Sequence, residues 1–234
     1  MKIMSFNTQH CLNFTTQMID FDIMAKAIID CEADIVGLNE MRGVGSYPEY
    51  TDQVKKLSEL TKMDYYYYYF ADAKVFPDNP YGNAILSKIP IIESETIIIP
   101  DPKTKIYNDH YETRCVLKAV LQNGAMVLIT HMGLNADERE NAVKTVLNYT
   151  RNEKCILMGD FNMSPDDSLL MPIKARMTDT AVLFDEEKLS FPSDNPVCKI
   201  DYIFVSNDIN IISADIPSIV ASDHRPCIST ISFT

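Results

Sequence analysis

Side chains that can bind metal ions or move protons recur in this chain directly after short apolar runs. The clearest case is ILMGDFN, where an apolar run and a glycine lead into Asp160 and Asn162. Turn chemistry alone would explain this pair, because Asp and Asn are frequent at the ends of strands. Active sites are commonly built on loops at strand ends, so a recurrence of this placement favours one convergent site. Polar residues lie at the ends of other apolar strands too. Asn7, Glu40 and His131 follow such a run, Asp201 lies within KIDYIF, and Asp223 and His224 come just before the CIST strand.

Each of these residues also has a simpler interpretation when it is taken alone. A Glu after a strand is usually solvated, a single His there is more often structural, and SDHRP could be a turn before proline. As a set, the residue types fit one chemistry. Carboxylates without a nearby cysteine suit Mg²⁺ or Mn²⁺ rather than zinc. Two imidazoles and an arginine suit a phosphoryl group, and an aspartate can orient water for hydrolysis.

Hydrophobic periodicity predicts the elements that would position these groups. A strand over 2–6, a helix over 20–32 and a strand over 34–38 form a strand–helix–strand unit, which favours parallel pairing. A helix over 136–150 leads into a strand over 154–160 in the second half. The other expected elements are a helix over 51–62 and strands over 64–70, 83–86, 90–99, 113–121, 125–130, 199–206, 209–216 and 227–233.

Three local patterns add to this outline. Asn123-Gly124 stands between two strand-like runs and predicts a hairpin. The five tyrosines at 65–69 suggest an aromatic stacking platform, but simple alternation across a strand is favoured. MSFN at 4–7 and GDFN at 159–162 both end a strand with Phe-Asn. This echo favours a two-fold pseudo-symmetric sandwich, with two sheets face to face and helices outside.

The composition favours an ordinary folded protein. The chain has 234 residues and is 46% hydrophobic, which allows one large domain or two small ones. No linker divides it, and we expect a single domain over 1–234. No stretch is apolar and long enough to span a membrane, and the start turns polar at Ser5, unlike a signal peptide. We therefore expect a cytoplasmic location. The six cysteines form no C-x-x-C pair and are expected to be buried hydrophobic residues.

The charge balance bears on the substrate. The 21 basic residues are outnumbered by 33 acidic ones, which gives a formal charge of −12. Proteins that follow a nucleic-acid backbone normally carry a basic face, because phosphate neutralisation supplies much of their affinity. Extended duplex DNA is therefore disfavoured as a substrate, although a local basic patch could still form in the fold.

The motifs together resemble a known family. MSFN, LNE, YGNAILSKIPI, ETR, THMG, GDFNMSP, IDYIF and SDHRP occur in this order and span nearly the whole chain. The set is similar to the endonuclease/exonuclease/phosphatase superfamily, whose members have the DNase I-like fold. The resemblance implies an α/β (α+β) four-layer sandwich, in which two mixed β-sheets pack face to face and helices cover both outer faces.

The resemblance also implies roles for individual residues. Glu40 resembles the principal metal ligand, Asn7 lies beside it, and Asp223 completes the metal site directly or through water. Asp160 resembles the residue that orients or deprotonates the attacking water. Asn162 resembles a group that positions the phosphate or the nucleophile.

Two imidazoles complete the implied site. His224 resembles the imidazole on the scissile phosphate and would be held by Asp201. His131 resembles a second phosphate-binding imidazole, and Glu112 is a candidate for the carboxylate that would orient it.

A spacing argument explains the pair in GDFN. Asp160 and Asn162 are two residues apart on a stretch expected to be extended, so their side chains should project to the same side. Phe161 would then point into the core. One carboxylate and one amide would face the same phosphate.

The implied activity is Mg²⁺- or Mn²⁺-dependent hydrolysis of a phosphodiester or phosphomonoester. Arg114 resembles a phosphate-contacting arginine, and Asn83 is expected to contact the substrate. The acidity and the lack of a large insertion favour a small or lipid-like phosphate ester. An endonuclease or exonuclease acting on DNA or RNA is the alternative. A catalytically silent binding module is disfavoured, because every expected catalytic position is filled.

Overall fold

The amino-terminal strand–helix–strand unit forms as predicted. β1 (Lys2–Asn7) and β2 (Ile35–Arg42) pair in parallel, and α1 (Phe21–Asp30) connects them. Asp20 caps the start of the helix, and its carboxylate accepts hydrogen bonds from the backbone N–H groups of Asp22 and Ile23. Apolar residues of α1 recur at helical spacing and are buried against the sheet.

A second unit of the same kind lies in the other half of the chain. β7 (Met126–His131) and β8 (Cys155–Asp160) pair in parallel through α3 (Ala136–Leu147). α3 begins with a capping box, in which Asn135 and Glu138 satisfy each other's exposed N–H groups.

The computed structural model describes residues 1–48, 50–71, 80–151 and 153–233. The further elements are η1 (Gln9–Cys11), α2 (Gln53–Thr61), β3 (Tyr65–Ala71), β4 (Tyr81–Ser87), β5 (Ile91–Ile98), β6 (Cys115–Leu121), η2 (Ser168–Leu170), α4 (Met171–Lys174), β9 (Met177–Asp179), η3 (Thr180–Leu183), β10 (Asp201–Ser206), β11 (Ile209–Asp215) and β12 (Cys227–Phe233).

Two mixed six-stranded sheets result, with the orders β11-β12-β1-β2-β4-β3 and β5-β6-β7-β8-β10-β9. Each sheet has one parallel pair near its centre, β1 with β2 and β7 with β8, and its other pairs are antiparallel. The two halves therefore match strand for strand, in agreement with the pseudo-symmetry inferred from the Phe-Asn echo.

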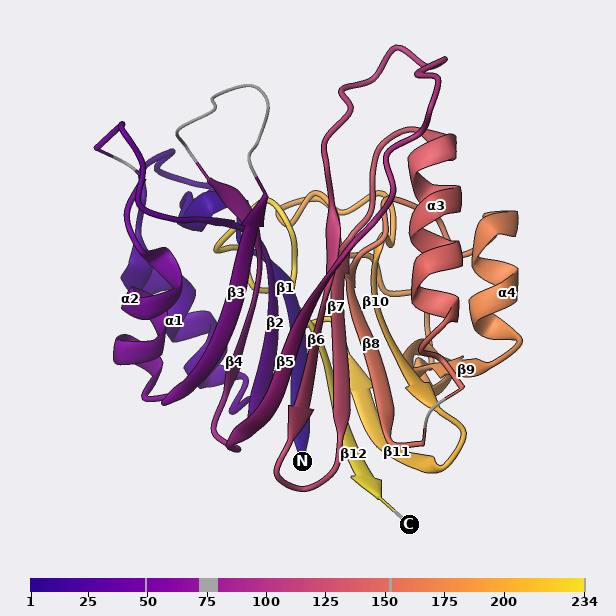
Figure 1. The fold of residues 1–234 in the computed structure, drawn as a ribbon. Coiled ribbons are helices and arrows are strands. Elements are labelled where there is room, and N and C mark those ends of the chain that lie inside the picture. The colour runs from indigo at the N-terminus through magenta and orange to yellow at the C-terminus, as the bar shows by residue number, and fades with distance from the viewer. Residues whose placement is uncertain (49, 72–79, 152, 234) are drawn as a thin grey trace.

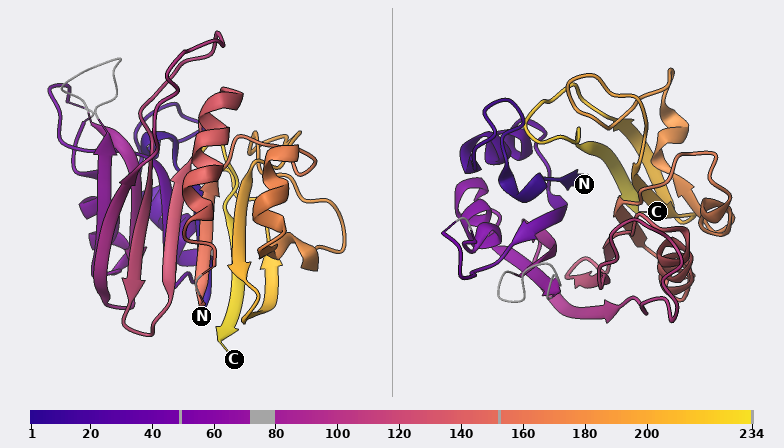
Figure 2. Two further views of the ribbon diagram at one scale, coloured as in Figure 1. Left: turned by 45° about the vertical axis from the view of Figure 1, so that its right-hand side comes forward. Right: turned by 90° about the horizontal axis from the view of Figure 1, so that it is seen from above.

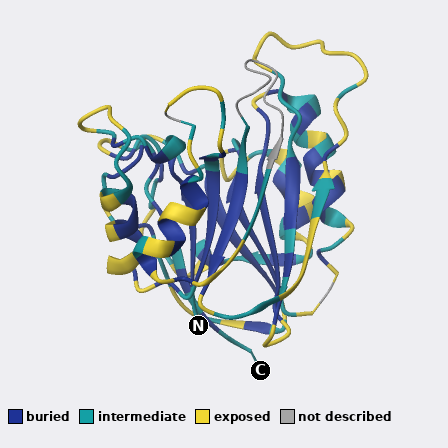
Figure 3. Ribbon diagram, turned by 60° about the vertical axis from the view of Figure 1, so that its left-hand side comes forward, coloured by how far each residue is buried: buried dark blue, intermediate teal, exposed yellow. Residues whose placement is uncertain are grey.

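The sheets pack face to face, and the helices form two outer layers (Figure 1). α1 and α2 cover one sheet, and α3 and α4 cover the other, so that the helix layers lie on opposite sides of the strands (Figure 2). Figure 3 shows buried residues concentrated in the strands and exposed residues on the helices and loops. The predicted fold class is confirmed. None of the described helices is both long and apolar enough to cross a lipid bilayer.

Local predictions are largely confirmed as well. β6 and β7 form the hairpin expected at Asn123-Gly124. In β3, Tyr67 packs into the layer between the sheets whereas Tyr68 packs toward the helices, as alternation requires. All six cysteines are free thiols, and five are buried, with Cys198 partly exposed. The short elements α4 and β9 and the three 3-10 turns were not expected from the sequence.

The strand predicted over 34–38 is longer than expected. β2 continues to Arg42, so Asn39 and Glu40 lie within the strand rather than after it. Its pairing register with β4 shifts between Leu38 and Met41, and Glu40 has a φ of 61°. Such an irregularity redirects a side chain without ending the strand. Here it affects Glu40, close to the carboxyl end of β2.

Gly159, just before Asp160, is required by the close approach of two strands. Its φ is 146°, and a Cβ atom there would lie 1.8 Å from the carbonyl oxygen of Thr130. Gly159→Ala is therefore expected to lower the free energy of unfolding by at least about 3 kcal/mol, because the two strands must separate or strain. Urea-induced unfolding followed by circular dichroism measures this change.

Gly124→Ala is the matched control, because Gly124 also has a positive φ, of 84°, but no atom lies within 4 Å of its added Cβ. It should cost about 1 kcal/mol from backbone conformation alone. Equal losses in the two variants would contradict the packing argument.

Candidate active site

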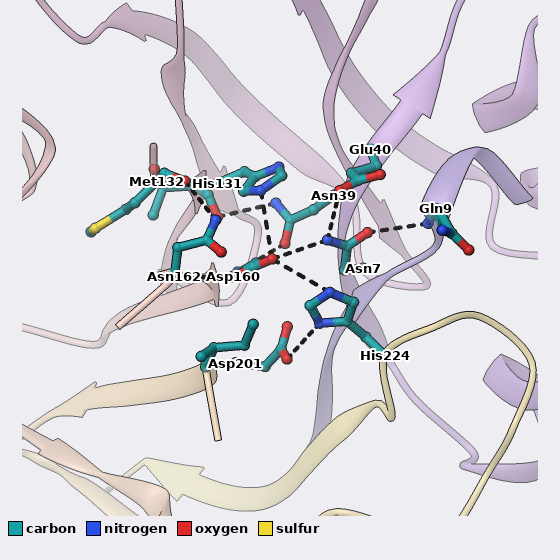
Figure 4. A network of polar contacts seen from close by, with 12 residues as sticks. Asn7, Gln9, Asn39, Glu40, His131, Met132, Asp160, Asn162, Asp201 and His224 are labelled. Atoms are coloured by element: carbon teal, nitrogen blue, oxygen red, sulfur yellow. Dashed lines mark hydrogen bonds and ion pairs between the residues drawn. The ribbon is translucent and has the colours of Figure 1, made fainter. Parts of the chain in front are cut away.

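The carboxyl ends of the parallel strands bring the predicted side chains together. Asn7 lies beside Asn39 in one sheet, and His131 lies beside Asp160 in the other. Asp160 is also the antiparallel partner of Asp201 at the start of β10. Figure 4 shows these side chains pointing toward one another from the two sheets. The site is therefore built across the interface of the sandwich, at one end of both sheets.

The amide of Asn7 bridges two carboxylates. Its Nδ2 donates to Oε1 of Glu40 and to Oδ2 of Asp160, each at 3.1 Å, and its Oδ1 accepts from the backbone N–H of Gln9. The amide nitrogen of Asn7 thus faces the two carboxylates, and its amide oxygen binds the backbone. In this arrangement it fixes the separation of Glu40 and Asp160, and its role as a metal ligand stays a prediction.

Both imidazoles converge on the same carboxylate oxygen. His131 Nε2 lies 3.5 Å and His224 Nε2 lies 3.7 Å from Oδ2 of Asp160. The other ring nitrogen of His224, Nδ1, lies 2.8 Å from Oδ2 of Asp201. Asp201 therefore occupies the place that the sequence prediction gives it, and it orients His224 toward Asp160.

Asn39 is a buried residue of the site that the sequence prediction omitted. Its Oδ1 accepts from the backbone N–H of Asp160, and its Nδ2 donates to the Thr130 carbonyl and to Oδ1 of Asn83. Asn39 thereby ties the two sheets together directly beneath Asp160. The signal available in the sequence was a carboxamide inside an apolar strand, next to Glu40.

Asn83 stands behind the site rather than within it. Its Oδ1 accepts from Asn39, and its Nδ2 donates to the Cys115 carbonyl at 3.3 Å. The side chain is almost fully buried. Its expected contact with substrate stays a prediction, since both polar atoms already have partners in the protein.

Asn162 reaches the site by a different backbone path from the one predicted. β8 ends at Asp160, and Asn162 has a φ of 50°, so the stretch is not extended there. Its N–H donates to Oδ1 of Asp160, and its Nδ2 donates to the Met132 carbonyl. Arg139 from α3 donates to the Asn162 carbonyl at 2.7 Å. Phe161 is fully buried in the core, as predicted.

Arg114 enters the site already paired. Its NH2 lies 2.8 Å from Oε2 of Glu112, and its NH1 donates to the His131 carbonyl at 3.4 Å. Glu112 was the candidate for orienting His131, but the structure pairs it with Arg114 and, at 3.7 Å, with His110. The arginine therefore supports the His131 strand while its guanidinium borders the pocket.

An open pocket of about 390 Å³ leads from the solvent to this arrangement. Its walls combine the acidic and imidazole groups with apolar side chains, and they include Asp223. The Asp223 carboxylate accepts from the hydroxyl of Ser222 and faces the same pocket. The lining residues are Glu40, Tyr81, Glu112, Arg114, His131, Leu134, Asp160, Asn162, Phe191, Ile200, Asp223 and His224.

Comparison with models of known protein families shows which family has this sequence pattern. The model of the "Endonuclease/Exonuclease/phosphatase family" matches residues 4–224, which is nearly the whole chain. The chain belongs to this family. Members of the family are phosphoesterase and nuclease hydrolases and are generally dependent on divalent metal ions. The resemblance inferred from the motifs is confirmed.

Solved structures of family members share the fold. An endonuclease/exonuclease/phosphatase from Beutenbergia cavernae superposes with a TM-score of 0.78 at 18% identity, covering 99% of this chain and 71% of its own. Bacteroides thetaiotaomicron mannosyl-6-phosphatase gives 0.76 at 17% identity over 100% of both chains. The human Nocturnin catalytic domain with bound sulfate gives 0.72 at 18% identity, covering 100% of this chain and 94% of its own. A search of curated proteins finds no match.

Burial and mutual repulsion raise the pKa values of the carboxylates in the site. Burial, together with the nearby carboxylates of Asp223 and Asp160, raises the pKa of Glu40 to about 7, against the opposing effects of the Asn7 hydrogen bond and of His224. Burial also raises the pKa of Asp160 and of Asp223 above their ordinary values. Crowded buried carboxylates repel one another, so a cation bound among them would relieve this cost.

The two histidines differ in charge. Burial opposes protonation of His224, but Asp201, Asp160 and Asp223 together raise its pKa to about 10. Burial and the nearby Arg114 guanidinium lower the pKa of His131 well below its ordinary value. At neutral pH the site therefore combines one cationic imidazole with one neutral imidazole.

The donor set fits a divalent metal ion. Glu40 and Asp223 supply carboxylate oxygens at the pocket, and no cysteine lines it. Hard oxygen donors suit Mg²⁺ or Mn²⁺. Ligand atoms of Asp160, Asp201 and His224 also lie within 4.8 Å of one another, although the short Asp201–His224 hydrogen bond already accounts for two of them.

Proposed function

We propose that this protein is a Mg²⁺- or Mn²⁺-dependent phosphoric ester hydrolase. The observation that carries the proposal is the position of Asp160, whose Oδ2 lies beside both imidazoles and shares the Asn7 amide with Glu40. This convergence of a carboxylate, two imidazoles and a second carboxylate on one point supports a general base, phosphate-binding imidazoles and a metal ligand acting together. Both sheets contribute to that point, which supports a single domain over residues 1–234.

The roles of the residues follow from their contacts. Asp160 accepts a proton from the attacking water and orients it, because its carboxylate is held by Asn7 and by the N–H of Asn162. His224, kept cationic and oriented by Asp201, donates a hydrogen bond to the phosphate oxygens. His131 adds a second contact from the opposite sheet.

Glu40 and Asp223 would hold the metal ion, with Asn7 fixing the Glu40 carboxylate. A divalent cation bound there would withdraw charge from the phosphoryl oxygens as a Lewis acid. Glu40 and Asp223 line the same pocket as Asp160 and His224, so a cation held by the two carboxylates would lie near the general base and the cationic imidazole.

Several features support a compact phosphate ester as the substrate. The pocket is small and its arginine, Arg114, is already paired with Glu112. The net charge of −12 opposes binding of a long polyanion. The similar Bacteroides protein is named a mannosyl-6-phosphatase, and the similar Nocturnin domain holds a sulfate anion. A nuclease acting on short DNA or RNA is the second candidate.

A substrate panel tests the proposal. Chromogenic phosphomonoesters and phosphodiesters, sugar phosphates, sphingomyelin, short oligonucleotides and plasmid DNA are incubated with the protein and Mg²⁺ or Mn²⁺. We expect turnover of a small or lipid-like ester and no nicking of plasmid at physiological salt. Preferential cleavage of oligonucleotides would favour the nuclease instead.

Removal of metal ions is expected to abolish hydrolysis, and Mg²⁺ or Mn²⁺ should restore it. Metal binding should also raise the melting temperature of the wild type, since a ligand that binds only the native state stabilises it. Glu40→Gln should show neither activity nor a metal-dependent shift in melting temperature, because it removes the carboxylate charge at the pocket. Turnover that survives exhaustive EDTA treatment would refute the metal-dependent mechanism.

A further inference from the structure

His10 lies beside Glu40 and was not among the residues predicted from the sequence. It belongs to η1, which follows β1 directly. Its Nδ1 lies 3.0 Å from the backbone carbonyl oxygen of Glu40, and its Nε2 lies 3.7 Å from Oε2 of the same residue. The ring of Tyr81 packs edge-on against the imidazole, with the ring centroids 5.2 Å apart. Both nitrogens of His10 therefore face one residue, the carboxylate proposed to bind metal.

The backbone contact determines which nitrogen carries the hydrogen. A carbonyl oxygen can only accept, so Nδ1 of His10 is the donor and Nε2 of the neutral ring carries the lone pair. The distance of 3.7 Å from Nε2 to Oε2 of Glu40 is too long for a hydrogen bond. A lone pair thus faces a carboxylate oxygen across a short gap, and a cation in that gap would satisfy both atoms.

The chain holds His10 in place with a strained backbone. Gln9, His10 and Cys11 have φ angles of 45°, 59° and 60°, in the left-handed region that residues other than glycine seldom adopt. The fully buried Gln53 donates to the His10 carbonyl at 2.7 Å and accepts from the N–H of Arg42 at 2.8 Å. Strained segments that the surroundings over-determine cluster at functional sites, so this construction points to a role for the imidazole.

We propose that His10 supplies Nε2 as a nitrogen ligand to the divalent cation held by Glu40. This inference rests on the metal site of the proposed function. Metal-binding histidines almost always donate their second ring N–H to a carbonyl or carboxylate, as His10 does to the Glu40 carbonyl. An imidazole ligand favours first-row transition-metal ions, whereas Mg²⁺ takes oxygen ligands. The site therefore binds Mn²⁺ in preference to Mg²⁺.

Electron spin-echo spectroscopy of the Mn²⁺-loaded protein tests this ligand, because a coordinated imidazole nitrogen modulates the echo. The wild type should show nitrogen modulation, and His10→Asn should lose it. Asn tolerates left-handed backbone and keeps an N–H donor near the position of Nδ1, so the fold and the carbonyl contact are retained. The chain has only four histidines, and His110→Asn, at a half-exposed side chain, is the matched control that should keep the modulation.

Binding constants give a second readout. Electron paramagnetic resonance titration should show the Mn²⁺ affinity of His10→Asn reduced tenfold or more, while the Mg²⁺ affinity, measured by competition, falls less. Equal losses for the two ions, or unchanged modulation, would overturn the assignment of His10 as a ligand. His10→Gln repeats both measurements if His10→Asn does not fold.

The same experiment separates the two proposals. Loss of modulation only in a variant of His131 or His224 would move the nitrogen ligand elsewhere and leave the cation at Glu40. A wild-type protein that binds no Mn²⁺, or a Glu40→Gln variant that binds it unchanged, would instead refute the proposed metal site itself.

Discussion

Asp160→Asn is expected to lower kcat/KM for phosphate-ester hydrolysis by about three orders of magnitude, in line with deletions of other catalytic residues. The carboxylate lies against both imidazoles and shares the Asn7 amide with Glu40. Asparagine has nearly the same shape but cannot take a proton from an attacking water. The loss should therefore fall mainly on kcat, and steady-state kinetics with a chromogenic ester measure it.

Asp64→Asn is the matched control for the loss of one negative charge, since Asp64 is exposed and lies outside the pocket. It should leave kcat/KM unchanged within about twofold. Circular dichroism and urea unfolding establish that Asp160→Asn is folded, which matters because Asn39 and Asn162 both bind this residue. A rate within tenfold of the wild type in a folded variant would remove Asp160 from the mechanism.

The position of Asp160 could be predicted from two signals in the sequence, an apolar run and the carboxylate that ends it. An uninterrupted apolar run identifies β8 as a buried strand, and its end at a carboxylate is visible without any coordinates. The same holds for Asn7 at the end of β1 and His131 at the end of β7. Parallel pairing of neighbouring strands then brings these ends to one edge of each sheet. Sequence patterns are therefore sufficient to predict the position of a side chain when that position depends only on the residue at which its strand ends.

Local irregularities of the backbone could not be predicted from the sequence pattern. A period-two pattern describes extended chain, so it predicted neither the left-handed conformation of Glu40 within β2 nor that of Asn162 after β8. In both cases contacts from other segments fix the backbone, such as the hydrogen bond from Arg139 to Asn162. His10 was missed for the same reason, because its placement needs Gln53, more than forty residues further along the chain.

Pairing between charged side chains was also invisible in the sequence. Arg114 and Glu112 are two residues apart, and their predicted partners were the phosphate for Arg114 and His131 for Glu112. In the structure they bind each other. Any choice among several partners depends on side-chain directions in a loop, and residue spacing along the chain does not determine these.

The pair formed by His224 and Asp201 should produce the second large effect. His224→Ala is expected to lower kcat by about three orders of magnitude, because it removes the cationic imidazole beside Asp160. The imidazole is almost fully buried and held by the 2.8 Å contact with Asp201. Steady-state kinetics at saturating metal ion measure the loss.

Asp201→Asn should act through the protonation of His224 and should therefore change the pH dependence of kcat. Asp201 is the carboxylate that contributes most to raising the pKa of His224 to about 10. A raised pKa keeps the imidazole protonated through neutral pH, so the wild-type rate falls only as the pH rises toward that value. Without the carboxylate charge the fall should begin at lower pH. Asp179→Asn, on the neighbouring strand and paired with Lys199, should leave the profile unchanged.

A double variant that carries both His224→Ala and Asp201→Asn tests whether the two residues act as one catalytic unit or contribute independently. If Asp201 acts only by orienting and charging His224, the double variant should be no more than about threefold slower than His224→Ala alone, since residues that act as a unit are strongly non-additive. If the two losses multiply, Asp201 acts through the fold instead. The structure favours the first outcome, because the Asp201 side chain makes its short hydrogen bond to His224 and its Oδ1 has no partner among the described residues.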